Sequence, residues 1–174
     1  MNSNLVKESK MNEIDTNRLK LRQWTDDDSD VYIRYFADEK NSKYFGGRKC
    51  ADDAWRHMAM QIGHWQLKGF GYWAVDEKES GDFVGCVGLW KSPSWPELEL
   101  GYWIASEQQR KGYAKEAAKE CVKYARNVLK AESLVSYIDP SNEPSIKLAG
   151  VLGASYEETI ELAEQGLHLV YRHF

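Results

Sequence analysis

The segment 109–114 has the residue types of an anion-binding turn. It follows an apolar segment with strand character, precedes an alanine-rich segment with helical periodicity, and contains Arg110, Lys111 and Gly112. The first N–H groups of a helix have no partner within the helix and carry the positive end of its dipole. Because glycine lets a phosphate approach the backbone closely, this turn is predicted to bind a phosphate or diphosphate. The alternative is an ordinary helix start with two solvated cations.

Glu99 is the second candidate for chemistry, because it stands within the apolar segment 97–104. Residues of a strand alternate between its two faces, so Glu97, Glu99 and Gly101 are expected to share one face. Burying an unpaired carboxylate costs free energy. Glu99 therefore either forms a salt bridge with a neighbouring strand or accepts a proton in catalysis. Glu164, beside a predicted turn near the end of the chain, is a further candidate for the proton acceptor.

Asn142 and Ser145 stand three residues apart, where a helix is expected to begin after Pro140. An asparagine at this position caps the first turn of a helix, and a serine is ordinary within that turn. Both side chains also lie close enough to contact one ligand. The two interpretations are compatible, and both stay open.

Composition limits the class of protein. The chain has 174 residues and a formal net charge of −4, so it has no broad electrostatic attraction to nucleic acid. No apolar run is long enough to cross a bilayer, and residues 1–12 are polar without the apolar segment of a secretion signal. We therefore expect a flexible tail over 1–12, one domain over 13–174, a cytoplasmic location, and no membrane or nucleic-acid partner.

The cysteines and histidines do not fall at zinc-ligand spacings, so no metal site is expected. The cysteines are odd in number and widely separated, as expected for reduced thiols. The cysteines are Cys50, Cys86 and Cys121, and the histidines are His57, His64, His168 and His173.

Hydrophobic periodicity predicts alternating strands and helices. Strands are expected over 17–23, 72–76, 83–90, 97–104, 133–138, 155–163 and 167–174, and helices from 26, from 52, over 111–130 and over 142–152. The sequence therefore predicts an α/β (α+β) fold with a mixed, mostly antiparallel central sheet and helices on both faces.

Four segments in this order resemble the motifs of the GNAT-superfamily N-acetyltransferases, nearest the branch of ribosomal-protein N-terminal acetyltransferases. The segments are 16–22, 97–104, 109–114 and 139–145, the last followed by 148–154. The resemblance covers 15–174 and implies a GNAT-like domain with acetyl-CoA as co-substrate. A strand edge also suits the amides of an extended arm, and a basic helix start suits a diphosphate.

The resemblance also implies roles for individual residues. Trp103 and Ile104 would pair with the pantetheine arm, Asn142 would bond one of its amides, and Ser145 would lie near the thioester sulfur. The diphosphate would be held by Gln109, Arg110, Lys111, Gly112, Tyr113 and Ala114.

One departure from the family concerns the general acid. Many members carry a tyrosine four residues before the glycine that ends the last helix, and here that residue is Ala149. Ser145 inherits the role by default, while Glu99 is the candidate base that deprotonates the amine through water. An oxyanion would be held by a backbone N–H near Ile104.

The function implied is acetyl transfer from acetyl-CoA to a primary amine, a protein N-terminus or a small amine, by direct attack in a ternary complex. Ala149 and the open assignment of the base keep a second interpretation, a non-catalytic sensor of CoA or acyl-CoA. A phosphate- or nucleotide-binding domain of another type is a third.

Exposed sheet edges make a homodimer plausible. Several aromatic residues are candidates for the acceptor pocket, with core packing as the alternative for each: Trp24, Phe45, Trp65, Trp73 and Trp90.

Overall fold

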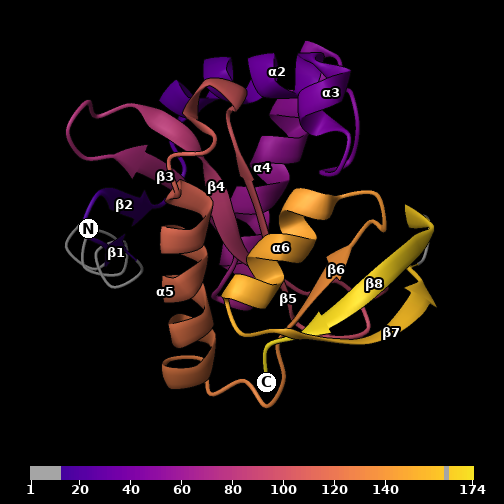
Figure 1. The fold of residues 1–174 in the computed structure, drawn as a ribbon. Coiled ribbons are helices and arrows are strands. Elements are labelled where there is room, and N and C mark those ends of the chain that lie inside the picture. The colour runs from indigo at the N-terminus through magenta and orange to yellow at the C-terminus, as the bar shows by residue number, and fades with distance from the viewer. Residues whose placement is uncertain (1–12, 163–164) are drawn as a thin grey trace.

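A strongly twisted mixed sheet organises the protein (Figure 1). The computed structural model describes residues 13–162 and 165–174, so the predictions for the tail 1–12 and for Glu164 fall outside the described residues. Within these residues the sheet has eight strands in the order β1-β2-β3-β4-β5-β6-β8-β7. Only the neighbours β5 and β6 are parallel among these strands, and the remaining pairs are antiparallel.

The strands are β1 (Ile14–Asp15), β2 (Leu19–Arg22), β3 (Tyr72–Glu77), β4 (Phe83–Trp90), β5 (Glu99–Ile104), β6 (Val135–Ile138), β7 (Ser155–Glu161) and β8 (Leu167–Arg172). The α-helices are α2 (Ser29–Ala37), α3 (Glu39–Ser42), α4 (Ala51–Lys68), α5 (Tyr113–Asn127) and α6 (Glu143–Val151). Two 3₁₀ turns, η1 (Asp26–Asp28) and η2 (Ser106–Gln108), precede α2 and the turn before α5.

The predicted elements are present, with shifted boundaries and two short additions, β1 and α3. The helix expected from 111 begins at Tyr113, because Arg110 and Gly112 adopt left-handed backbone angles with φ of +62° and +85°. Those angles are incompatible with a right-handed helix. The strand expected from 97 begins at Glu99, because the N–H of Glu97 is bonded to the Tyr137 hydroxyl rather than to a strand.

Helices cover both faces of the sheet, as the sequence predicts. On one face, Trp103 of β5 stacks on Tyr35 of α2 with ring centroids 3.9 Å apart. On the other face, Trp73 of β3 meets Tyr124 of α5 edge-on at 5.0 Å. Figure 1 shows α5 and α6 in front of the sheet and α4 behind it. Two layers of helix therefore enclose the apolar centre of the sheet, and none of the described helices is long and apolar enough to cross a membrane.

Neighbouring groups at the centre of the sheet leave no room for a Cβ at several glycines of β4 and β5, among them Gly88 and Gly101. A Cβ added to Gly88 of β4 would overlap the backbone of Tyr72 on β3. A Cβ added to Gly101 of β5 would overlap the Tyr72 hydroxyl. Tyr72 therefore lies directly over the glycine of β5, on the face that also carries Glu99.

Replacing Gly88 with alanine is expected to lower the free energy of unfolding by about 2–3 kcal/mol, because the strands must move apart to admit one methyl group. Gly63→Ala is the matched control, since Gly63 lies within α4 with open space around its Cβ. There the change is expected to be neutral or to stabilise by up to about 1 kcal/mol. Urea denaturation of both variants measures the difference, and equal stabilities would contradict the packing described.

Candidate active site

The parallel strands β5 and β6 separate from each other partway along β5. Their described register is the single pair Glu99 and Val135, next to the backbone bond from Val135 N–H to the Leu98 carbonyl at 3.0 Å. Further along, the Leu100 carbonyl accepts a bond from the Ser136 hydroxyl at 2.8 Å instead of from a backbone N–H. Beyond this point the edge of β5 is open, and we call the space between β5 and the start of α6 the interstrand gap.

Alternation of the backbone decides which groups of β5 face the gap. Ala105 N–H donates to the Val84 carbonyl on the β4 side, whereas the Leu98 and Leu100 carbonyls point to the β6 side. By the same alternation the N–H groups of Tyr102 and Ile104 point toward the gap. The Ile104 carbonyl is already bonded by Gln109 Nε2 at 3.0 Å. The edge therefore offers backbone donors of the kind that an extended amide chain can pair with.

Of the two strand residues predicted to contact the cofactor, the structure directs only Ile104 toward the gap. The backbone of Trp103 faces β4, and its indole packs against Tyr35. Tyr102, which the sequence analysis did not select, has the position expected of Trp103. The alternation of β5 was the signal that could have identified it.

The turn 109–114 has the geometry of an anion-binding loop. Arg110 and Gly112 are both left-handed, with Lys111 between them, and α5 begins immediately afterwards at Tyr113. Such alternating conformations direct successive N–H groups into one concavity. No described side chain caps this end of α5, so the first N–H groups of the helix remain available as donors. The side chains of Arg110 and Lys111 are exposed beside them.

Arg18 fixes this turn from the other end of the sequence. Its Nη1 donates to the Lys111 carbonyl at 2.8 Å, and its Nε donates to Glu116 of α5 at 2.8 Å. The Glu116 carboxylate also accepts from the Arg18 N–H and from the Thr16 hydroxyl. The guanidinium lies 4.9 Å from the centre of the Tyr113 ring. Sequence reasoning assigned no role to Arg18 or Glu116, because their spacing is far too long for a local pattern.

Glu99 is partly buried and accepts a bond from the Trp95 indole at 2.5 Å. Burial raises the pKa of Glu99 to about 7, although bonds from the Trp95 indole and the Tyr137 backbone act in the opposite direction. No cation among the described residues pairs with it. The salt bridge belongs instead to Glu97, whose pKa is lowered to about 2, chiefly by its bonds to Arg172. Of the two alternatives for Glu99, the salt bridge is wrong.

The start of α6 forms the opposite side of the gap. Asn142 is the N-cap, and its Oδ1 accepts from the Ser145 N–H at 3.3 Å. No residue in the described part of the chain bonds the Asn142 amide nitrogen, so this group can donate to a ligand. The Tyr102 hydroxyl reaches across from β5 and lies 3.5 Å from the Ser145 carbonyl. Ala149 is buried against Ile138 and carries no group that could take part in chemistry.

Residues from the first half of the chain contact both sides of the gap. The Tyr44 hydroxyl lies 3.1 Å from the carbonyl and the hydroxyl of Ser141, which precedes α6. Asn41 of α3 contacts the Ser106 hydroxyl, which follows β5. The segment around α3 therefore bridges the loops that follow β5 and β6.

Three of the five aromatic residues predicted for an acceptor pocket have other positions. Trp73 faces α5, and the indoles of Trp24 and Trp65 both donate to the Tyr72 carbonyl, at 2.7 and 2.8 Å. Phe45 and Trp90 both contact Tyr72, which lies over Gly101 of β5; their ring centroids are 5.4 and 6.4 Å from that of Tyr72. Trp90 also stacks on His64 at 4.2 Å. The ring nitrogens of His64 lie against the backbone carbonyls of Phe70 and Lys91, so His64 has a structural role.

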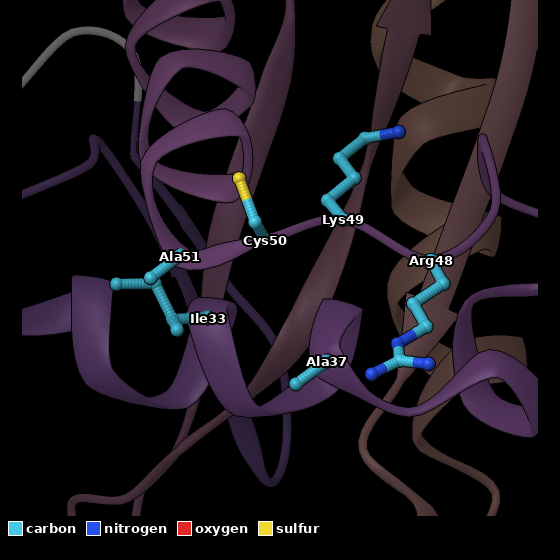
Figure 2. Close-up of a pocket in the computed structure, with 6 residues that line it drawn as sticks. All are labelled: Ile33, Ala37, Arg48, Lys49, Cys50 and Ala51. Carbon is cyan, nitrogen blue, oxygen red and sulfur yellow. The ribbon is translucent and has the colours of Figure 1, made fainter.

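A separate hollow of about 470 Å³ lies between α2 and the start of α4 (Figure 2). It is lined by Ile33, Ala37, Arg48, Lys49, Cys50 and Ala51. The Cys50 thiol bonds the Asp53 carboxylate at 3.2 Å. No residue of β5, the turn 109–114 or α6 contributes to this hollow, which is therefore distinct from the gap. Within the described residues no histidine, cysteine and carboxylate groups gather as a metal site would require.

Comparison with known proteins gives a consistent assignment. Residues 18–155 match the family model described as an acetyltransferase (GNAT) domain. The chain is 30% identical to the uncharacterized protein YkkB of Bacillus subtilis over 83% of its own length and 86% of that protein. It is 28% identical to the uncharacterized N-acetyltransferase p20 of Bacillus licheniformis, over 82% of each chain. A crystal structure of an acetyltransferase from Agrobacterium tumefaciens superimposes with a TM-score of 0.85, at 29% identity, over 93% of this chain and 94% of that one.

The chain therefore belongs to the GNAT family and is an acetyl-CoA-dependent acyltransferase. The predicted fold class is confirmed by the same structural match.

Glu99 and Glu97 are expected to affect stability with opposite signs. The folded-state pKa of Glu99 is raised, so its burial costs nothing below the ordinary carboxyl pKa of 4.5 and its full penalty above about 7. Glu99→Gln should therefore stabilise the protein by up to about 3 kcal/mol at pH 8 and by much less at pH 5. Glu97 has a lowered pKa, so Glu97→Gln should destabilise the protein equally at both pH values. Urea denaturation at pH 5 and pH 8 measures both, and a pH-independent effect of Glu99→Gln would contradict the assignment.

Proposed function

We propose that this acetyltransferase transfers the acetyl group to a primary amine, by direct attack on acetyl-CoA in a ternary complex. The observation that carries the proposal is the proximity, on one strand, of a carboxylate with raised pKa and an open backbone edge. Tyr102 lies three residues after Glu99, about 10 Å along the strand. A donor bound along the open edge would thus place its thioester where Glu99 can exchange a proton with the acceptor amine through water.

The turn 109–114 would hold the diphosphate of the co-substrate. Its left-handed residues and the uncapped start of α5 supply N–H donors, and Lys111 and Arg110 supply charge. The pantetheine arm would extend along β5 and pair with the Ile104 N–H and the Tyr102 carbonyl, with the Asn142 amide nitrogen as a further donor. These assignments agree with the roles that the resemblance implies for Gln109, Gly112, Tyr113 and Ala114.

Glu99 would act as the general base. A primary amine has a pKa near 10 and is mostly protonated at neutral pH, so it must lose a proton before it attacks. A carboxylate with a pKa of about 7 accepts that proton, through water, more readily than an ordinary glutamate. As nitrogen bonds to the carbonyl carbon, the developing oxyanion is stabilised by the Tyr102 N–H, a contribution of about 3 kcal/mol for one well-placed donor.

The acceptor would approach from the face that carries Glu99. That face is lined by Phe45, Tyr72 and Trp90, which suits an amine on an apolar or aromatic carrier. Protein N-termini and small amines both satisfy this description. The alternative of a CoA sensor is favoured by one observation, Ala149 at the position of the usual tyrosine, and the experiment below separates the two.

Incubation with acetyl-CoA and a panel of amines, with free thiol as the readout, is expected to show acceptor-dependent release of CoA. The panel contains peptides with free N-termini, amino acids, polyamines and amino sugars. Glu99→Gln should lower kcat by about 10²–10⁴-fold and remove the rise in rate through pH 7. Glu97→Gln is the control and should keep that pH dependence. Tight binding of acetyl-CoA without thiol release for any amine would favour the sensor instead.

Gly112→Asp is expected to weaken CoA binding at least about tenfold, because it adds negative charge beside the diphosphate and a side chain at a left-handed position. Gly81→Asp is the matched control, since Gly81 has a φ of +77° in the β3–β4 turn and open space around its Cβ. It should carry the same backbone strain without any loss of affinity. Isothermal titration calorimetry with CoA measures both variants, and equal affinities would refute the placement of the diphosphate.

A further inference from the structure

Acetyl transfer leaves a thiolate that needs a proton, and α6 carries no obvious donor for it. The position from which many family members donate is Ala149, which is buried against Ile138 and Ala154. Ser145 has a hydroxyl at the gap, but an aliphatic alcohol is a far weaker acid than a thiol and donates a proton poorly. The donor is therefore to be sought on another element that borders the gap.

The Tyr102 side chain enters the gap from β5. Its hydroxyl lies 3.5 Å from the Ser145 carbonyl, and the Ser145 side chain is a further hydrogen-bonding neighbour. Burial raises the pKa of Tyr102 above its ordinary value, so the phenol is fully protonated at neutral pH. A phenol has a reference pKa of about 10, much closer to the value of about 8.5 for a thiol than the pKa of an aliphatic alcohol is, so of the two hydroxyls at the gap the phenol is the stronger proton donor.

The alternation of β5 places Glu99 and Tyr102 on opposite faces of the sheet. Glu99 faces the side of Tyr72 and α4, and Tyr102 faces α6. An acceptor that arrives beside Glu99 and a sulfur that departs toward α6 lie on opposite sides of the carbonyl carbon. Glu99 therefore lies on the side from which the amine attacks, and Tyr102 lies on the side toward which the sulfur departs.

We propose that Tyr102 is the general acid of the transfer, and that Ser145 positions its hydroxyl. This inference rests on the proposed function. The ammonium ion first loses one proton through Glu99 to solvent. The neutral amine nitrogen then forms a bond to the thioester carbon and passes its second proton to Glu99. The carbon–sulfur bond breaks, its electron pair stays on sulfur, and sulfur takes the proton from Tyr102 Oη. Solvent then returns a proton to the phenolate and removes one from Glu99, so the products are the amide and the free thiol of CoA.

Tyr102→Phe tests the proposal, because it removes one hydroxyl and keeps the ring. We expect kcat to fall by about 10²-fold, with the Kd for CoA unchanged, because CoA is bound by the backbone of residue 102. The wild type should lose activity at alkaline pH as the phenol ionises, and the variant should lack that decline. Tyr156→Phe on the exposed strand β7 is the matched control and should match the wild type in rate and pH profile.

The outcomes separate this inference from the proposed function. If the wild type releases CoA with an amine while Tyr102→Phe keeps its rate and alkaline limb, the inference is overturned and the proposed function stands. A parallel loss of CoA affinity in Tyr102→Phe would also overturn it, because the residue would then act in binding. Absence of thiol release by the wild type with every amine would instead refute the proposed function. Ser145→Ala is expected to reduce kcat less than Tyr102→Phe, and a larger loss would return the role to Ser145.

Discussion

The bond from the Ser136 hydroxyl to the Leu100 carbonyl ends the backbone pairing of two central parallel strands. A continued ladder would consume the N–H groups of Tyr102 and Ile104, and the sheet would close. Because the Ser136 hydroxyl takes the place of the next backbone donor, β5 and β6 are paired before Leu100 and separate after it. The gap therefore costs the fold little, because the β5 carbonyls at the two ends of the open edge are bonded by side chains, Leu100 by Ser136 and Ile104 by Gln109.

Successive side chains of β5 point to opposite faces of the sheet, so the polar groups beside the gap lie on different faces. One face presents Glu99 among aromatic rings, and the other presents the Tyr102 hydroxyl to α6. Glu97, outside the strand, forms an ion pair with Arg172 and has a lowered pKa. Two carboxylates separated by one residue thus differ in pKa because one has a cation and the other has only an indole and a backbone donor. This division suits a structural role for Glu97 and proton transfer for Glu99.

The sequence predicted those features that depend on local patterns. Strand and helix periodicity fixed the order of the elements and the fold class, and membership of the GNAT family is confirmed. Glycine and two cations before an alanine-rich helix predicted an anion-binding turn at 109–114; the structure shows left-handed Arg110 and Gly112 there, and anion binding stays a prediction. Contacts between distant segments were beyond such patterns. Arg18 reaches Lys111 and Glu116 only after β2 packs against α5, and Trp73 faces α5 rather than the acceptor because of the register of β3. Tyr102 was missed because two aromatic residues stand side by side in β5, and only the alternation of the strand, set by its pairing with β4, places residue 102 rather than residue 103 at the gap.

A crystal structure of the protein with CoA tests the central claim most directly. The account predicts that the diphosphate contacts the N–H groups of residues 111–114 and that the pantetheine amides pair with Tyr102 and Ile104, with the sulfur between Glu99 and Tyr102. CoA bound in the hollow beside Cys50, or along the outer edge of β7, with the β5 edge still unpaired, would contradict it.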